Sequence, residues 1–181
     1  MNLLTIEKLT KSYTDRILFD NVTFGINEGD KVGVIGVNGT GKSTLLKIIS
    51  GLEEGDSGTV TKGNNIKITY LPQNPSFHEK LTILENVLEG AVTSEGHWNL
   101  EGEAKSMLNK LGIPDYNGDI ASLSGGQKKR VALVRTLLHP ADILALDEPT
   151  NHLDLQAIEW LEDFLRSSSS AFLGISHDRY F

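Results

Sequence analysis

The stretch GVNGTGKS, Gly36 to Ser43, constrains the fold of this chain more than any other. It follows a buried apolar run, KVGVIG, and precedes the helical pattern KSTLLKIISG, so it stands between a predicted strand and a predicted helix. Its glycines allow positive φ and leave backbone N–H groups free to face an anion at the start of the helix. In this context the spacing predicts a phosphate-binding loop, in which Lys42 reaches the β- and γ-phosphates and Ser43 holds Mg²⁺.

A pair of acidic residues ends a second apolar run further along the chain, DILALDEP. The run predicts a buried strand that delivers Asp147 and Glu148 to its carboxyl end, where ligands bind in open α/β sheets. We expect Asp147 to contribute to the Mg²⁺ shell through water and Glu148 to orient or deprotonate an attacking water. Two solvated acids at a strand end are the alternative, which the glycine loop upstream makes the weaker interpretation.

The order of predicted elements indicates an α/β protein with a mostly parallel sheet covered by helices, a P-loop NTPase fold. A short β region precedes the glycine loop, and a helical insert at about 80–122 opens with a capping box formed by Thr82 and Glu85. The predicted strands cover 3–9, 22–26, 31–36, 65–73, 142–147 and 171–176, and helices are expected at about 125–138 and 154–166.

Length and composition limit the class of protein. A chain of 181 residues suffices for one domain, and we expect a single unit over 1–181. The net charge of −7 argues against a basic nucleic-acid-binding surface, and the absence of cysteine excludes disulfides and thiolate metal sites. No apolar run approaches the roughly 20 residues of a membrane span, and no secretory signal is visible, so we expect a cytoplasmic protein.

The stretch SLSGGQKKRVALV predicts a second anion site. Ser124 and Gln127 have capping-box spacing, and Gly125 and Gly126 expose backbone N–H groups at the start of a helix. Cations at 128–130 are mildly unfavourable there unless an anion lies nearby, although they are equally compatible with a solvated basic face. The helical insert separates this site from the first loop, so one nucleotide within one domain is not expected to reach both.

The motifs GVNGTGKST, LSGGQ, LALDEP and SHD, in this order, resemble those of the ABC (ATP-binding cassette) ATPases along nearly the whole chain. The resemblance implies that Gln73 senses Mg²⁺ and the attacking water, that His177 contacts the γ-phosphate and that Tyr13 stacks on adenine. From the residue types alone, each of the three could equally be structural. The nucleotide-binding residues that the resemblance implies are Tyr13, Gly36, Asn38, Gly39, Gly41, Lys42, Ser43, Thr44, Ser124, Gly125, Gly126 and Gln127.

The same resemblance implies a partner and a cofactor. In ABC ATPases two cassettes pair head to tail, and the LSGGQ motif of one closes over the γ-phosphate of the ATP that the other binds with Mg²⁺. The second anion site would then serve the nucleotide of a second cassette.

DEPTNHLDL and SHDRYF resemble the ABC-F proteins, soluble twin-cassette ATPases that act on the ribosome in translation control or antibiotic resistance. This chain is then expected to be a first cassette, truncated after the switch histidine. Two other functions stay open: the ATPase subunit of an ABC membrane transporter, and a module that binds nucleotide without turnover.

Overall fold

The computed structural model describes residues 1–35, 41–89 and 97–176, and the side chains of His97 and Trp98 are not part of this description. The described chain divides into two compact units. The first is drawn from Met1–Tyr70, Ala141–Pro149 and Ser167–Phe181, and the second from Leu71–Pro140 and Thr150–Arg166. Each unit is described by itself.

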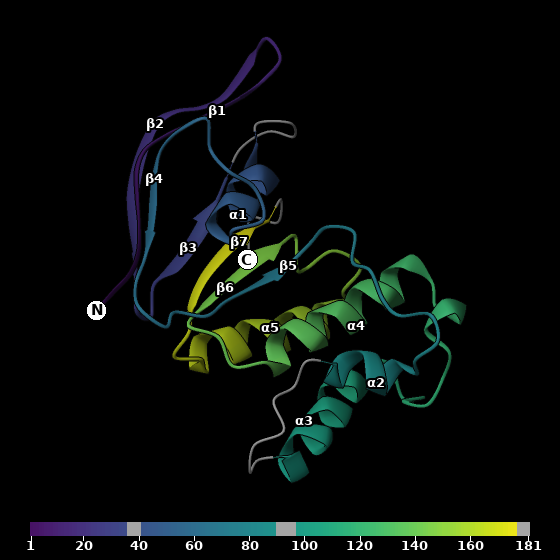
Figure 1. Ribbon diagram of the computed structural model, residues 1–181. Coiled ribbons are helices and arrows are strands. Elements are labelled where there is room, and N and C mark those ends of the chain that lie inside the picture. The colour runs from purple at the N-terminus through teal and green to yellow at the C-terminus, as the bar shows by residue number, and fades with distance from the viewer. Residues whose placement is uncertain (36–40, 90–96, 177–181) are drawn as a thin grey trace. The chain divides into compact units, whose positions relative to one another are not determined.

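The first unit contains a three-stranded antiparallel sheet of order β2-β1-β4 (Figure 1). Strands β1 (Asn2–Tyr13) and β2 (Arg16–Asn27) form a hairpin and are both longer than the predicted 3–9 and 22–26. Strand β4 (Ser57–Lys62) was not predicted, because all six of its residues are exposed and it lacks an apolar face. It pairs with β1 in a register that joins Leu4 to Lys62.

A four-stranded sheet of order β3-β7-β6-β5 completes the first unit (Figure 1). Strands β3 (Lys31–Val34) and β6 (Ile143–Asp147) both pair in parallel with β7 (Ala171–Ile175). Helix α1 (Lys42–Ile49) packs against β6 and β7. The α/β expectation is therefore confirmed, although β5 (Ile68–Leu71) is shorter than the predicted 65–73.

The core of the first unit joins both sheets and α1. Leu4, Ile6 and Leu9 of β1 lie in the same cluster as the apolar residues of α1, β6 and β7. Burial of these apolar side chains stabilises the unit and holds α1 against β6 and β7. The remaining members of this cluster are Leu3, Ile26, Leu45, Leu46, Ile48, Ile49, Ile66, Ile143, Ala145, Ala171, Leu173 and Ile175.

The second unit is helical. Helices α2 (Ile83–Leu88), α3 (His97–Lys110) and α4 (Gly125–Leu138) pack against one another. A 3₁₀ turn at Ile120–Ser122 and helix α5 (Leu155–Ser167) complete it. The predicted helix at 125–138 and the capping box at the start of α2 are confirmed. None of the helices in the described ranges is long and apolar enough to cross a membrane.

Candidate functional site

The start of α1 is the first part of the candidate site. Gly41 is the N-cap residue with φ 89° and ψ 17°, no side chain caps the helix, and no acidic residue lies in its first turn. The first N–H groups of any helix lack a partner within the helix, so those at Lys42, Ser43 and Thr44 can face an anion. Lys42 itself is only 9% exposed. The predicted loop residues Gly36, Asn38 and Gly39 lie outside the described residues.

Two acidic residues stand at the carboxyl end of β6. Asp147 is 2% exposed and Glu148 is 9% exposed. Glu148 has φ 50°, in the left-handed region, and its N–H donates to the carbonyl of Ile175 at 2.9 Å. A non-glycine residue in this region is strained, and such strain is concentrated at functional sites. The backbone of Glu148 is therefore fixed to β7 directly beyond the end of β6.

The charge of Asp147 affects its surroundings. Burial, and then the negative charge of Asp147, raise the pKa of Tyr70 to about 12. The Ser43 hydroxyl and the Asp147 carboxylate are the oxygen donors that Mg²⁺ prefers. No cluster of three or more His, Cys, Asp or Glu residues that could hold a metal occurs in the described parts of the chain. This donor set fits an ion that is bound by one carboxylate together with substrate phosphates.

At the start of α4, the side chains of the first turn accept hydrogen bonds from its backbone N–H groups. The Ser124 hydroxyl accepts a hydrogen bond from the Gln127 N–H at 3.2 Å, and the Gln127 side-chain carbonyl accepts one from the Ser124 N–H at 2.9 Å. The predicted capping box is confirmed. Gly126 packs beside His152, because a Cβ atom at Gly126 would lie 3.2 Å from the Cβ of His152.

Two cations of α4, Lys129 and Arg130, donate to backbone carbonyls within the second unit. Lys129 is 6% exposed, and its Nζ donates to the carbonyl of Gln73 at 3.5 Å. Arg130 donates through Nη1 to the carbonyl of Leu111, at the C-terminal end of α3, at 3.0 Å. A cation is favourable at this negative end of a helix dipole. A solvated basic face is therefore the wrong interpretation for Lys129 and Arg130.

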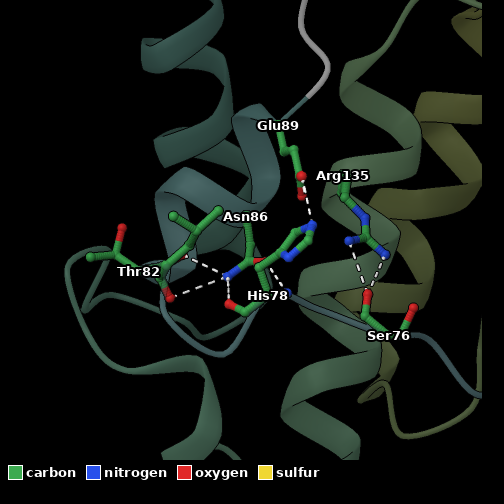
Figure 2. Close-up of polar contacts among 7 residues, drawn as sticks. Ser76, His78, Thr82, Asn86, Glu89 and Arg135 are labelled. Carbon is green, nitrogen blue, oxygen red and sulfur yellow. Dashed lines mark hydrogen bonds and ion pairs between the residues drawn. The ribbon is translucent and has the colours of Figure 1, made fainter.

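Gln73 is exposed, and the segment that follows it is fixed to α4. Both Nη atoms of Arg135 donate to the carbonyl of Ser76, each at 3.1 Å (Figure 2). Its guanidinium lies 4.5 Å from the centre of the Phe77 ring. Lys129 and Arg135 thus attach the backbone at Gln73 and at Ser76 to the same helix, α4. Sequence reasoning missed this contact.

The side chain of Asn86, on α2, binds the continuation of this segment at residues 78–82. This side chain is 0% exposed, and its amide nitrogen donates to the carbonyls of His78 at 3.1 Å, Leu81 at 3.2 Å and Thr82 at 3.0 Å (Figure 2). Its oxygen accepts from the His78 N–H at 2.9 Å. The signal in the sequence was a polar residue on the apolar face of TILENVLEG, because a buried amide needs such partners.

The remaining two predicted site residues are placed differently. Tyr13 is 45% exposed at the end of β1, and its hydroxyl donates to the carboxylate of Glu53. His177 lies outside the described residues. The structure thus brings the start of α1 and the end of β6 into one unit, and it places Gln73 and the start of α4 in the other.

A helix start with a glycine N-cap and two buried acids at the end of a parallel strand, in one α/β unit, define a nucleotide-binding protein of the P-loop class. The family described as ABC transporter matches residues 19–151. The chain therefore belongs to this family of ATP-binding cassettes, whose members are ATPases.

Relatives and solved structures agree with this membership. The chain is 39% identical to the uncharacterized ABC transporter ATP-binding protein YfmR of Bacillus subtilis, over 100% of this chain and 34% of the relative. It is 34% identical to the energy-dependent translational throttle protein EttA of Escherichia coli K12, over 92% of this chain and 37% of the relative. The chain thus spans little more than a third of these relatives.

Two solved structures have the same fold. The ATP-binding subunit of an ABC transporter superposes with a TM-score of 0.83 at 27% identity, over 97% of this chain and 79% of that one. A dimeric ATP-binding cassette in a post-hydrolysis state with ADP and Pi superposes with a TM-score of 0.81 at 28% identity, over 97% and 88%.

Proposed function

We propose that this chain is the MgATP-hydrolysing cassette of a cytoplasmic ABC-F protein that acts on the ribosome. The likeness to EttA, a translational throttle protein by name, supports this proposal, and so does the DEPTNHLDL stretch. A second cassette would complete the site, and the dimeric state of a similar solved cassette supports that arrangement. ATP rather than GTP is proposed from the family resemblance.

The chemistry follows from the residues at the start of α1 and the end of β6. The N–H groups of the first turn and the Lys42 ammonium would bind the β- and γ-phosphates and stabilise the charge that develops on the transferred group. Glu148 would orient the water that attacks the γ-phosphate. Ser43 and Asp147, with Gln73, would hold Mg²⁺, which when bound neutralises phosphate charge. His177 would contact the γ-phosphate.

The pairing partner would contribute the start of its own α4. Ser124 to Gln127 present a preformed helix start with small residues, and such a helix end attracts anions. In the proposed arrangement this turn caps the γ-phosphate that the other cassette holds, and each chain contributes to both sites.

The position of Glu148 is the observation that carries the proposal, because its side chain is buried and its backbone is in the left-handed region at the end of a strand. Both features lower the stability of the folded chain, so they indicate a residue that is kept for function. We expect Glu148→Gln to keep ATP affinity within about twofold and to lower turnover by about 100-fold or more, since a positioned base contributes about 10²–10⁴ in rate. ATP should also hold this variant as a stable pair, measurable by light scattering after size exclusion.

The exposed Glu159 on α5 provides the matched control. Glu159→Gln should leave binding, turnover and pairing unchanged. Turnover of Glu148→Gln equal to that of the unaltered protein would remove this residue from the chemistry. If the isolated chain binds ATP and releases no phosphate, the chain by itself is a nucleotide-binding module that needs its partner.

A transporter subunit is the second candidate, favoured by the likeness to a solved ATP-binding subunit of an ABC transporter. Fractionation of the full-length protein distinguishes the two. Sedimentation with ribosomes in ATP supports the first proposal, and recovery only from detergent-extracted membranes supports the second.

A further inference from the structure

The surroundings of Tyr13 are more constrained than those of an ordinary surface tyrosine. The Nζ of Lys11 lies over the ring, 5.2 Å from its centre. The phenol hydroxyl donates to the Glu53 carboxylate. A cation over one face and an anchored hydroxyl at the edge fix the plane of the ring. Tyr13 is 45% exposed, so Lys11 and Glu53 leave part of the residue accessible to a ligand.

Lys11 is itself held in place. Its side chain is 12% exposed, and its Nζ donates to the carbonyl of Glu54 at 2.8 Å. The same nitrogen lies 3.4 Å from a carboxylate oxygen of Glu53 and 3.6 Å from one of Asp56. One hydrogen bond and two ion pairs thus hold the ammonium in its position over the ring.

The turn at residues 53–56, which contains Glu53, is hydrogen-bonded to the end of β1. Asp56 accepts hydrogen bonds from the Ser12 N–H at 2.7 Å and from the Ser12 hydroxyl at 3.0 Å, and its own N–H donates to the carbonyl of Thr10 at 2.8 Å. The bond from the Ser12 N–H is the main reason that the pKa of Asp56 lies below its usual value. Glu53 is therefore presented to Tyr13 by a turn with its own anchors.

This end of the hairpin also adjoins the phosphate-binding start of α1. Lys11 pairs across the ladder with Phe19. A Cβ atom at Gly41 would lie 2.9 Å from the Cβ of Leu18 and 3.1 Å from the ring of Phe19, so the α-carbon of Gly41 rests against β2. The Tyr13 ring thus belongs to the hairpin that contacts the N-cap of α1.

We propose that Lys11 and Glu53 are positioning residues for the nucleotide, which hold the Tyr13 ring as a fixed stacking surface for the purine base. The inference rests on the proposed function, because it requires a nucleoside triphosphate with its phosphates at the start of α1. A ring that is already fixed loses little conformational freedom when the base stacks on it, and this preorganisation strengthens binding.

The test measures binding of ATP and of tripolyphosphate, which has no base, to the whole chain by titration calorimetry with Mg²⁺. Lys11→Met and Glu53→Ala should each weaken ATP binding by about 3- to 10-fold and leave tripolyphosphate affinity unchanged. Lys11→Arg and Glu53→Gln, which keep the cation and the hydrogen-bond acceptor, should restore most of the ATP affinity.

Two further variants separate positioning from a structural role. In a Tyr13→Leu background, Lys11→Met should have no additional effect on ATP binding, because the ring that it orients is gone. Glu54→Gln changes a neighbouring exposed carboxylate whose backbone, not its side chain, bonds to Lys11, and it should have no effect.

Unchanged ATP affinity in both Lys11→Met and Glu53→Ala would overturn the inference. Equal weakening of ATP and tripolyphosphate would also overturn it, because the loss would then not involve the base. If the unaltered chain bound neither ligand, the proposed nucleotide site itself would fail, which is a different result.

Discussion

Helices α1 and α4 both have glycine and a cation at or near their start, and they differ in how the first turn is capped. At α1 the N-cap is Gly41 with a left-handed backbone, and no side chain satisfies the first N–H groups. At α4 the N-cap is Ser124, and its capping box with Gln127 satisfies two backbone donors. Neither helix has an acidic residue in its first turn.

The difference indicates two kinds of anion site. A helix start without a side-chain cap presents backbone N–H groups that an anionic ligand can satisfy. A capped start is stable without a ligand and offers fewer donors, here those of Gly125 and Gly126. We infer that α1 binds the phosphate chain by itself, whereas α4 is a preformed surface that closes over a phosphate already bound elsewhere.

The largest expected effect is that of Gly41→Ala. The left-handed backbone costs a non-glycine residue about 1–2 kcal/mol, and the overlap of the new methyl group with Leu18 and Phe19 adds about 1–3 kcal/mol. We expect a lower free energy of unfolding in urea and the loss of measurable ATP binding, because the first turn of α1 must shift. Retention of normal ATP affinity would show that the uncapped start is not the phosphate site.

Much of this contrast could be predicted from the sequence, because caps are local. The spacing of Ser124 and Gln127, and of Thr82 and Glu85, predicts both capping boxes, and the structure contains them. The buried strands β6 and β7 follow from short apolar runs in the same way.

Features that depend on distant partners could not be predicted. Strand β4 is exposed throughout and forms because β1 offers a free edge. The buried Lys129 donates to a carbonyl 56 positions away. The bond between Tyr13 and Glu53 joins residues 40 positions apart, one at the end of β1 and the other in the loop that precedes β4. Tertiary contacts decide such cases, and local pattern carries no signal for them.

A second prediction compares the two capping boxes. Ser124→Ala and Thr82→Ala each remove a hydroxyl that accepts a hydrogen bond at 3.2 Å, from Gln127 and Glu85 respectively. Each should lower the free energy of unfolding by about 1 kcal/mol. Only Ser124→Ala should weaken pairing in ATP, since only α4 is proposed to face the partner's phosphate. Equal loss of pairing in both variants would attribute the effect to stability alone.

The smallest expected effect sharpens the comparison within the first turn of α4. A Cβ at Gly125 would meet nothing within 4 Å, whereas one at Gly126 would meet the side chain of His152 at 3.2–3.5 Å. Gly125→Ala should therefore raise the free energy of unfolding by up to about 1 kcal/mol through helix propensity. Gly126→Ala should gain less, because His152 must move by a few tenths of an ångström.

Two measurements check this pair. Urea unfolding gives the difference in stability, and the imidazole resonances of His152 should shift in Gly126→Ala and stay unchanged in Gly125→Ala. In ATP both variants should pair more weakly than the unaltered chain, because each methyl group adds bulk where the partner's phosphate is proposed to approach. If Gly125→Ala, with its undisturbed fold, pairs normally, then the open donors of α4 do not meet a phosphate, and the two helix starts differ in function as well as in capping.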